Sequence, residues 1–174
     1  SLLCHSKGVP LVLDNTLAGL HQHGDTDVDL FIHSLTKYAS GHGDVMGGAV
    51  IGSAELIRKL RSDFVLLGGV LDPHAAFLIQ RGLKTYLLRF EAQCAGAQKV
   101  AEFLAAHDKV DRVHYPGLPS HPRHALASRQ MRDFGTVVSF DLRAGGPAGD
   151  RFADALQLFE IAASMGSPES LVIP

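Results

Sequence analysis

Residues 28–38 read VDLFIHSLTKY, an apolar run that stops at a cluster of polar side chains. A short apolar run with polar boundaries is typical of a buried strand. Two similar runs flank it, one at residues 9–13, which ends at Asp14, and one at residues 46–51, which is rich in small residues. We therefore expect three strands in this half of the chain, in a mainly parallel sheet covered by helices.

The helices predicted after these strands have recognisable ends and faces. Ser53 is placed to cap the helix that follows it. A long helix is expected to begin near Pro73, because apolar residues from 83 to 104 recur every three or four positions and form one stripe. Cys94 lies on that stripe, so we expect its thiol to be buried.

After residue 109 the pattern changes to short elements separated by turns. We expect residues 1–109 to form one domain that ends in the long helix, and residues 110–174 to begin a second, smaller α+β domain. The elements expected there are strands at 110–115, 136–142 and 161–163, helices at 124–131 and 151–159, and a turn at 145–147.

The composition excludes several functional classes. The 174 residues include 16 Lys and Arg against 18 Asp and Glu, with 46% hydrophobic and 20% charged residues, which is typical of a globular chain and not of a disordered one. A net charge of −2 gives no basic excess, so no nucleic-acid partner is expected. Because no apolar run reaches about 18 residues, no membrane span is expected either.

The two cysteines, Cys4 and Cys94, are too few for a disulfide framework or a four-thiolate zinc site. We therefore expect a reducing, cytoplasmic compartment. Residues 1–8 read as the end of a helix that runs into a turn, and residues 170–174 are an apolar run without a polar finish. Both ends look cut, so we expect the chain to be a segment of something larger.

Polar groups gather after two predicted strands, at the edge where open α/β sheets bind ligands. Asp14 follows one strand, and Ser34, Thr36 and Lys37 follow the next. A lysine can form a Schiff base with an aldehyde, hydroxyl and backbone N–H groups can bind a phosphate, and a carboxylate can keep a pyridine nitrogen protonated. Each residue alone has an ordinary structural interpretation as a turn former, a backbone partner or a solvated side chain. The combination favours a phosphorylated aldehyde cofactor.

Several motifs together carry a family resemblance that covers essentially the whole chain. They are VLDNT at 12–16, HSLTKY at 33–38, GHGD at 41–44, GLKT at 82–85, YPGLPSHP at 115–122, SMG at 164–166 and ESL at 169–171. With these motifs the chain resembles the Cys/Met-metabolism (trans-sulfuration) family of enzymes that depend on pyridoxal 5'-phosphate (PLP).

The resemblance implies an α/β fold of the PLP-dependent transferase (aspartate aminotransferase-like) type, with part of the large domain followed by the start of the small one. It implies PLP as cofactor, with Lys37 in a Schiff base to its aldehyde and Asp14 paired with the pyridinium nitrogen. Ser34 and Thr36 would bind the phosphate. Ser164 would lie near the lysine and the carboxylate of the substrate.

The resemblance also implies carbon–sulfur chemistry: γ-elimination or γ-replacement on methionine, cystathionine or acylated homoserine, with Lys37 as the base for the Cα proton. The substrate would be a small amino acid, and the complete enzyme a homo-oligomer, a dimer of dimers. Leu17 stands where the family commonly has an aromatic residue, and residues 21–24 also depart from its pattern. Because other family segments lie outside this chain, we expect it to be inactive or nearly so by itself.

Two other interpretations stay open. His21, His23, Asp25 and Asp27 would make a metal-binding domain if they alternate along an extended segment. Alternatively, the chain is a truncated, non-catalytic member that acts as an interaction module through exposed apolar faces. For His42 a catalytic role as a base is weaker than a structural hydrogen bond.

Overall fold

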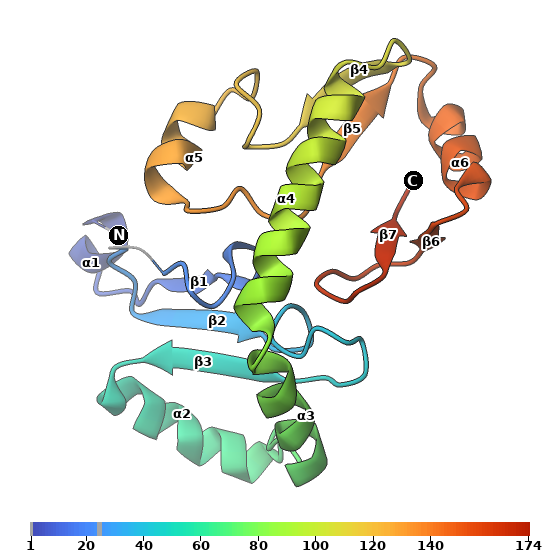
Figure 1. Cartoon of the computed structure of the whole chain (residues 1–174). Coiled ribbons are helices and arrows are strands. Elements are labelled where there is room, and N and C mark those ends of the chain that lie inside the picture. Colours follow the sequence, from blue (N-terminus) through green and yellow to red (C-terminus); the bar gives the residue numbers. More distant parts are fainter. Residues whose placement is uncertain (1, 24–25) are drawn as a thin grey trace.

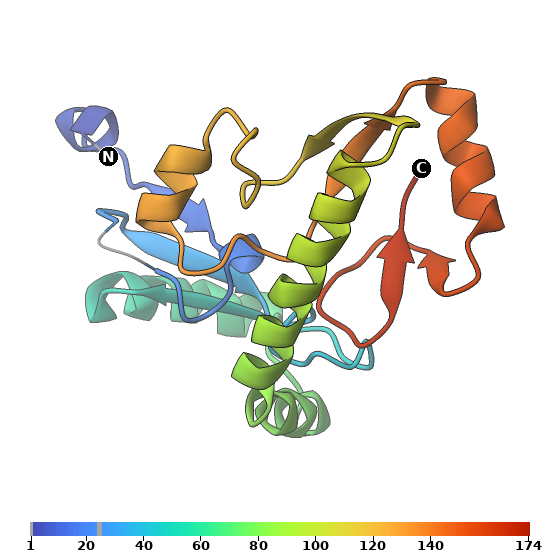
Figure 2. The same ribbon diagram turned by 45° about the horizontal axis from the view of Figure 1, so that its top comes forward.

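The computed structural model describes residues 2–23 and 26–174. Helices and strands are mixed along the whole chain, and Figures 1 and 2 show the long helix α4 passing between the strands of the two halves. The elements are α1 Leu2–Ser6, β1 Val12–Asp14, the 3₁₀ turn Thr16–Ala18, β2 Leu30–Ser34, β3 Gly48–Gly52, α2 Ala54–Leu67, α3 Pro73–Leu83, α4 Tyr86–Ala105, β4 Val110–His114, α5 His124–Gln130, β5 Ser139–Leu142, α6 Gly146–Ala155, β6 Phe159–Ile161 and β7 Ser170–Val172.

The first three strands form one sheet in the order β1-β2-β3, as three strands were expected. Strands β1 and β2 are parallel, with Asp14 beside Ile32. Strands β2 and β3 are antiparallel, with Ser34 beside Gly48, so the expectation of a mainly parallel sheet is only half right. The reason is the connection: residues 35–47 contain no helix, and a parallel pair needs a crossover of a dozen or more residues, usually helical.

The predicted cap at Ser53 is confirmed, but the long helix predicted from Pro73 to Leu104 is interrupted. Ser53 caps α2 by accepting a hydrogen bond from the backbone N–H of Leu56. Pro73 does begin a helix, α3, which ends at Leu83, and α4 begins only at Tyr86.

The break between α3 and α4 has a local cause. The carbonyl oxygen of Gly82 accepts from the backbone N–H of Thr85 at 3.2 Å and from Arg89 Nη2 at 2.8 Å. It is therefore not bonded to the N–H of Tyr86 as it would be in a continuous helix. Thr85 has φ −115° and ψ 8°, outside helical values.

The break also rotates the apolar stripe. Leu83 and Leu87 are exposed, whereas Tyr86, Phe90 and Cys94 are buried. The expected burial of Cys94 is confirmed, and that burial raises the pKa of its thiol to about 12.

The second half departs from its predicted boundaries most at α6. Residues 145–147 were expected to be a turn, but Gly145, at φ 74°, directly precedes a helix that begins at Gly146 and has Pro147 in its first turn. Proline is well suited to that position because its missing N–H has no helical partner there. The helix ends at Ala155, and Phe159–Ile161 is a strand instead of a helix end.

Buried apolar side chains of the described residues gather in three clusters, and two of these lie beside the turn that follows β2. Tyr38 packs in a cluster with Tyr86, Phe90 and Cys94. Val45, at the other end of the same turn, packs with two side chains of α3, Ala75 and Ile79.

The third cluster joins α4 to the second half through Ala97, Ala101, Leu104, Val110, Val113, Tyr115 and Leu118. Helix α4 therefore contributes to the core on both sides of residue 109, and the division into two domains at that residue stays a prediction.

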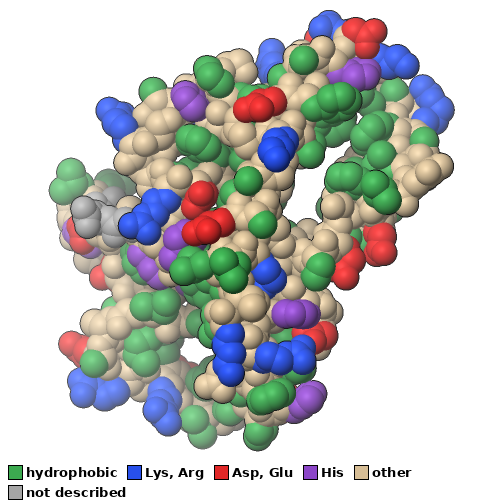
Figure 3. Space-filling view, in the orientation of Figure 1, with side chains coloured by type: hydrophobic (Ala, Val, Ile, Leu, Met, Phe, Trp, Pro, Cys, Tyr) green, Lys and Arg blue, Asp and Glu red, His purple; other side chains and the backbone are tan. Residues whose placement is uncertain are grey.

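Apolar side chains also remain at the surface. Val50 and Ile51 of β3 are exposed, and so are Leu66 and Leu67 at the end of α2. Figure 3 shows such side chains interspersed with charged ones over one face of the molecule. Within residues 2–23 and 26–174, no helix is long and apolar enough to cross a membrane.

Gly82 lies where the backbone of α3 closely approaches the turn after β2. A Cβ atom at this position would overlap the carbonyl oxygen of Ser40 and would lie 2.6 Å from that of Ala39. Backbone atoms cannot move aside as a flexible side chain could, so only glycine fits here.

We predict that Gly82→Ala lowers the free energy of unfolding by about 1–3 kcal/mol, the usual cost of overpacking. The matched control is Gly96→Ala in α4, where a new Cβ meets nothing within 4 Å. That control is expected to gain roughly 0.5–1 kcal/mol, as Ala does over Gly inside a helix. Urea unfolding of both variants checks this, and equal midpoints would contradict the close contact.

Candidate active site

Lys37 lies in the turn directly after β2, and its amine meets a residue from the far end of the chain. Lys37 Nζ donates a hydrogen bond to Ser164 Oγ at 3.3 Å, in an exposed position. In the part of the chain that the structure describes, no carboxylate oxygen lies within 4.0 Å of this amine. Two predicted site residues, 127 positions apart in sequence, are thus brought together.

Gly166 allows the segment around Ser164 to pack on the backbone of the lysine turn, residues 35–47 between β2 and β3. It has φ +86°, and a Cβ there would lie 2.7 Å from the nitrogen of Tyr38 and 2.9 Å from the carbonyl carbon of Lys37. Gln93 of α4 holds the same segment by donating from Nε2 to the carbonyl oxygen of Ser167 at 3.0 Å.

Asp14 and Ser34 end the two parallel strands, and Thr16 connects them. The backbone N–H of Thr16 donates to Asp14 Oδ1 at 3.0 Å, and the backbone N–H of Ser34 donates to Thr16 Oγ1 at 2.8 Å. The hydroxyl and then the N–H of Thr16 hold the pKa of the Asp14 carboxyl below its ordinary value. Asp14 is therefore an exposed carboxylate at neutral pH, the state that a protonated pyridine nitrogen requires.

The expected phosphate donors are only partly free. Thr36 Oγ1 accepts from the N–H of Gly47 at 3.0 Å and donates to its carbonyl oxygen at 3.3 Å. That carbonyl oxygen also accepts from the backbone N–H groups of Leu35 and Thr36. These N–H groups are thus unavailable to a phosphate, which leaves the hydroxyl groups of Ser34 and Thr36.

The residues present fit an aldehyde-bearing, phosphorylated pyridine such as PLP. Lys37, Asp14, Ser34 and Thr36 lie at or just beyond the carboxyl ends of β1 and β2, the strand ends that Figure 1 shows side by side. They supply an amine that meets no carboxylate of the described residues, an ionised carboxylate and two hydroxyl groups. One hydroxyl, that of Thr36, has to turn its proton away from Gly47 to donate to a phosphate.

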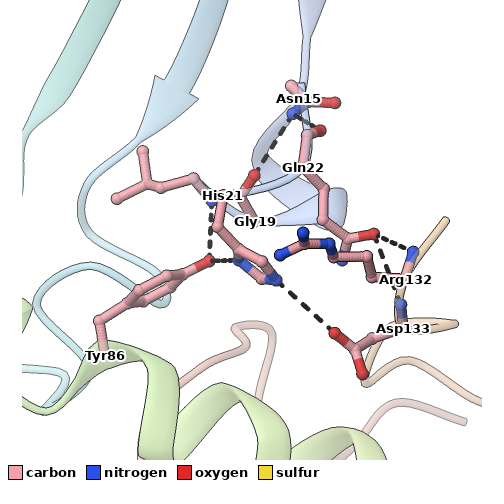
Figure 4. Close-up of polar contacts among 8 residues, drawn as sticks. Asn15, Gly19, His21, Gln22, Tyr86, Arg132 and Asp133 are labelled. Atoms are coloured by element: carbon pink, nitrogen blue, oxygen red, sulfur yellow. Dashed lines mark hydrogen bonds and ion pairs between the residues drawn. The ribbon is translucent and has the colours of Figure 1, made fainter. Parts of the chain in front are cut away.

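The loop between β1 and β2 is held by polar contacts from both halves of the chain (Figure 4). Asn15, which is 8% exposed, donates from Nδ2 to the carbonyl oxygens of Gly19 and Gln22. Gln22 Oε1 accepts from the backbone N–H of Arg132 at 2.7 Å. The chain just after Asp14 is therefore fixed although it forms no regular element beyond one short turn.

His21 makes a second connection in the same loop (Figure 4). Its Nδ1 lies 2.8 Å from the hydroxyl of Tyr86, and its Nε2 lies 3.6 Å from Asp133 Oδ2. Tyr86 also accepts from the backbone N–H of Leu20 at 2.8 Å.

The described members of the expected histidine cluster do not form a metal site. His21 points to Tyr86 and Asp133, whereas His23 Nε2 lies 2.9 Å from Nε2 of His33. Asp25 lies outside the described residues. Elsewhere in residues 2–23 and 26–174, no group of three or more His, Cys, Asp or Glu is arranged to hold a metal ion.

The structural interpretation of His42 is confirmed. Its Nδ1 donates to the carbonyl oxygen of Ser40 at 2.7 Å, within the turn that follows Lys37.

Sequence reasoning missed the residues that support the site. Thr16 was part of a quoted motif but had no assigned role, although a threonine two residues after an Asp commonly bonds to it. Gly166 belongs to the SMG motif, but the motif did not predict its close contact with the backbone of Lys37 and Tyr38. Arg89 had no signal in the sequence, because its contacts depend on how distant segments pack.

Comparison with known proteins points to one family. The profile of the family described as "Cys/Met metabolism PLP-dependent enzyme" matches residues 1–174. A chloroplastic cystathionine γ-synthase of Arabidopsis thaliana is 46% identical over 99% of this chain and 31% of its own length. An L-methionine γ-lyase of Pseudomonas putida is 44% identical over 97% of this chain and 44% of its own length.

Among solved structures, cystathionine γ-synthase from Xanthomonas oryzae pv. oryzae in complex with cystathionine superposes with a TM-score of 0.91. It is 41% identical, and the match covers 97% of this chain and 44% of that one. The chain therefore spans less than half the length of these relatives, and they include both a synthase and a lyase.

We predict that Thr16→Val raises the pKa of the Asp14 carboxyl, because the hydroxyl that lowers it most is removed while the backbone N–H remains. A carboxyl with a lowered pKa stays ionised further into acid, so the wild-type titration midpoint lies at lower pH than that of the variant. NMR titration of the side-chain carboxyl checks this, with Asp14→Asn to assign the resonance. Coincident titration curves would rule out the assigned role of Thr16.

Proposed function

The chain belongs to the Cys/Met metabolism family of PLP-dependent enzymes, and from this premise we propose that it carries the lysine, carboxylate and hydroxyl groups of a PLP site in a sulfur amino-acid enzyme. The observation that supports this most is the Lys37 amine, which meets Ser164 and no described carboxylate. We further propose the α/β fold of PLP-dependent transferases, with the large domain in residues 1–109 and the small domain beginning at residue 110.

Each of the four proposed cofactor-binding residues is assigned to a different part of PLP or shares one part with a neighbour. Lys37 is assigned to hold the aldehyde, Asp14 the ring nitrogen, and Ser34 and Thr36 the phosphate. When bound, PLP supplies an aldehyde that captures amines and a ring that accepts the electrons released at a substrate carbon. Asp14 contributes its negative charge, which keeps the proton on the ring nitrogen, and Thr16 keeps Asp14 ionised.

Lys37 and Ser164 are assigned to proton transfer and to the substrate. The free amine at Nζ takes the proton from the substrate Cα and can return it to another carbon of the same substrate. Ser164 Oγ accepts a hydrogen bond from this amine, so it keeps Nζ directed toward the substrate side. The same hydroxyl is placed to meet the substrate carboxylate.

The reaction that we propose is γ-elimination or γ-replacement on methionine, cystathionine or acylated homoserine. Both remain in the proposal because the residues of this chain serve both, and the similar proteins carry the names of both classes. Product analysis of the protein made from its complete coding sequence separates them. A thiol or an oxo acid released without an acceptor indicates elimination, and a new thioether formed with added cysteine indicates replacement.

We also propose a cytoplasmic homo-oligomer, a dimer of dimers, with a small amino acid as its substrate. Both cysteines carry free thiols in the structure, as a reducing compartment requires.

Lys37→Ala is predicted to abolish covalent capture of PLP. In the protein made from the complete coding sequence, borohydride fixes the cofactor on the amine that holds it, and peptide mass mapping identifies that amine. We expect the tag on Lys37 in the wild type and no tag in the variant. Lys99→Ala, an exposed lysine of α4, is the matched control and keeps the tag. A tag on any other lysine refutes the assignment.

Thr36→Val is predicted to weaken PLP binding roughly 10- to 150-fold, because a hydrogen bond to a charged group contributes about 1.5–3 kcal/mol. Thr36→Ser keeps the hydroxyl and should bind PLP almost as tightly as the wild type. Fluorescence titration of the protein freed of cofactor measures both constants. Equal weakening by serine and valine would contradict the role of the Thr36 hydroxyl, because serine keeps that group.

A further inference from the structure

Arg89, in the first turn of α4, makes the densest set of polar contacts around the lysine turn. Its Nη1 and Nη2 both donate to the carbonyl oxygen of Tyr38 at 3.1 Å. Nη2 also donates to the carbonyl oxygen of Gly82 at 2.8 Å, and Nε donates to Thr85 Oγ1 at 3.0 Å. One half-buried guanidinium therefore connects the lysine turn, the end of α3 and the start of α4.

The space for this guanidinium depends on a glycine. Gly41 has φ +65°, and a Cβ on it would overlap Arg89 Nη1. Any larger residue at position 41 would expel the arginine as well as strain the backbone.

The positively charged guanidinium of Arg89 donates mainly to backbone carbonyl oxygens. Across the described residues no carboxylate oxygen lies within 4.0 Å of its guanidinium. The carbonyl groups at the C-terminus of α3 carry partial negative charge, so a cation there is favourable. Lysine could not reproduce this contact, because only a planar fork can donate twice to one oxygen and once to another.

The position of Lys37 follows from these contacts. Arg89 fixes the carbonyl of Tyr38 on one side of the turn, and Gly166 packs against the peptide between Lys37 and Tyr38 on the other. The backbone of Lys37 is thus held from two sides, and only the torsions of its side chain remain free to adjust.

We propose that Arg89 is a positioning residue for Lys37: by holding the Tyr38 carbonyl, it sets where Nζ lies when the amine captures an aldehyde cofactor. This role rests on the proposed function, because it concerns the same lysine. Arg89 does not touch the cofactor in this proposal and acts only through the backbone of the turn.

The test compares PLP capture by Arg89→Met, Arg89→Lys and the wild type, each made from the complete coding sequence and freed of cofactor. Stopped-flow absorbance measures the capture rate, and a spectroscopic pH titration of the lysine-bound cofactor reports the environment of Nζ. We expect Arg89→Met to capture PLP about 10- to 100-fold more slowly and with a shifted titration midpoint, since small misplacements of a reacting group cost rate of this order. Arg89→Lys should fall between the two.

Val113→Ala is the control for stability alone. Val113 is buried in the cluster between α4 and β4, away from the lysine turn, so its truncation destabilises the fold without touching Arg89. It should capture PLP at the wild-type rate with an unchanged titration. If Arg89→Met does not fold, Arg89→Lys carries the test, because it also loses the double bond to Tyr38.

The outcomes separate this proposal from the proposed function. If borohydride leaves no tag on wild-type Lys37, the proposed function fails. If the wild type is tagged but the Arg89 variants match it in rate and titration, or match Val113→Ala in both, only the positioning role is overturned.

Discussion

The structure depends on the contact between the backbone of the lysine turn and the junction of α3 and α4. Gly82 lies directly against the carbonyl groups of Ala39 and Ser40, and Arg89 donates to that of Tyr38. The same oxygen of Gly82 that accepts from Arg89 is lost to the helix, so the chain breaks there and α4 starts with a new orientation. That orientation buries Tyr86 and Phe90 behind Tyr38.

The buried and the reactive parts of the site lie on consecutive residues. Tyr38 belongs to the core, whereas Lys37 keeps its amine at the surface with the hydroxyl of Ser164 as its partner. On the neighbouring strand, Asp14 is exposed and ionised with help from Thr16. The groups assigned to chemistry thus lie on a polar rim, and the rigidity that they need comes from the apolar clusters and glycine contacts behind them. The similarity to γ-synthases and γ-lyases of the Cys/Met metabolism family fits this arrangement.

Sequence patterns predicted the local features well, because these depend on neighbouring residues. The cap at Ser53, the helix start at Pro73 and the buried position of Cys94 all follow from spacing along one element. The pairing of Lys37 with Ser164 followed from resemblance to a family and not from spacing. No periodicity relates residues 127 positions apart.

The features that the sequence did not predict depend instead on contacts between distant residues. The helix break at Thr85 could not be predicted from the apolar stripe, because the Gly82 oxygen accepts there from Thr85 and from Arg89, and apolar spacing does not report such contacts. A strand was expected at 161–163, but β6 lies two residues earlier, and its parallel pairing with β7 was not predicted. The contacts of Thr16 with Ser34 and of Arg89 with Tyr38 could not be predicted for the same reason: the fold brings these backbone groups together.

The central claim is that Lys37 is the residue that holds the cofactor at the rim formed by β1 and β2. A crystal structure of the complete protein grown with PLP tests it most directly. If Lys37 holds the cofactor, electron density runs continuously from its Nζ to the cofactor, with the Asp14 carboxylate at the ring nitrogen and the hydroxyl groups of Ser34 and Thr36 at the phosphate. Density that joins the cofactor to another lysine, or a ring nitrogen that faces away from Asp14, would contradict it.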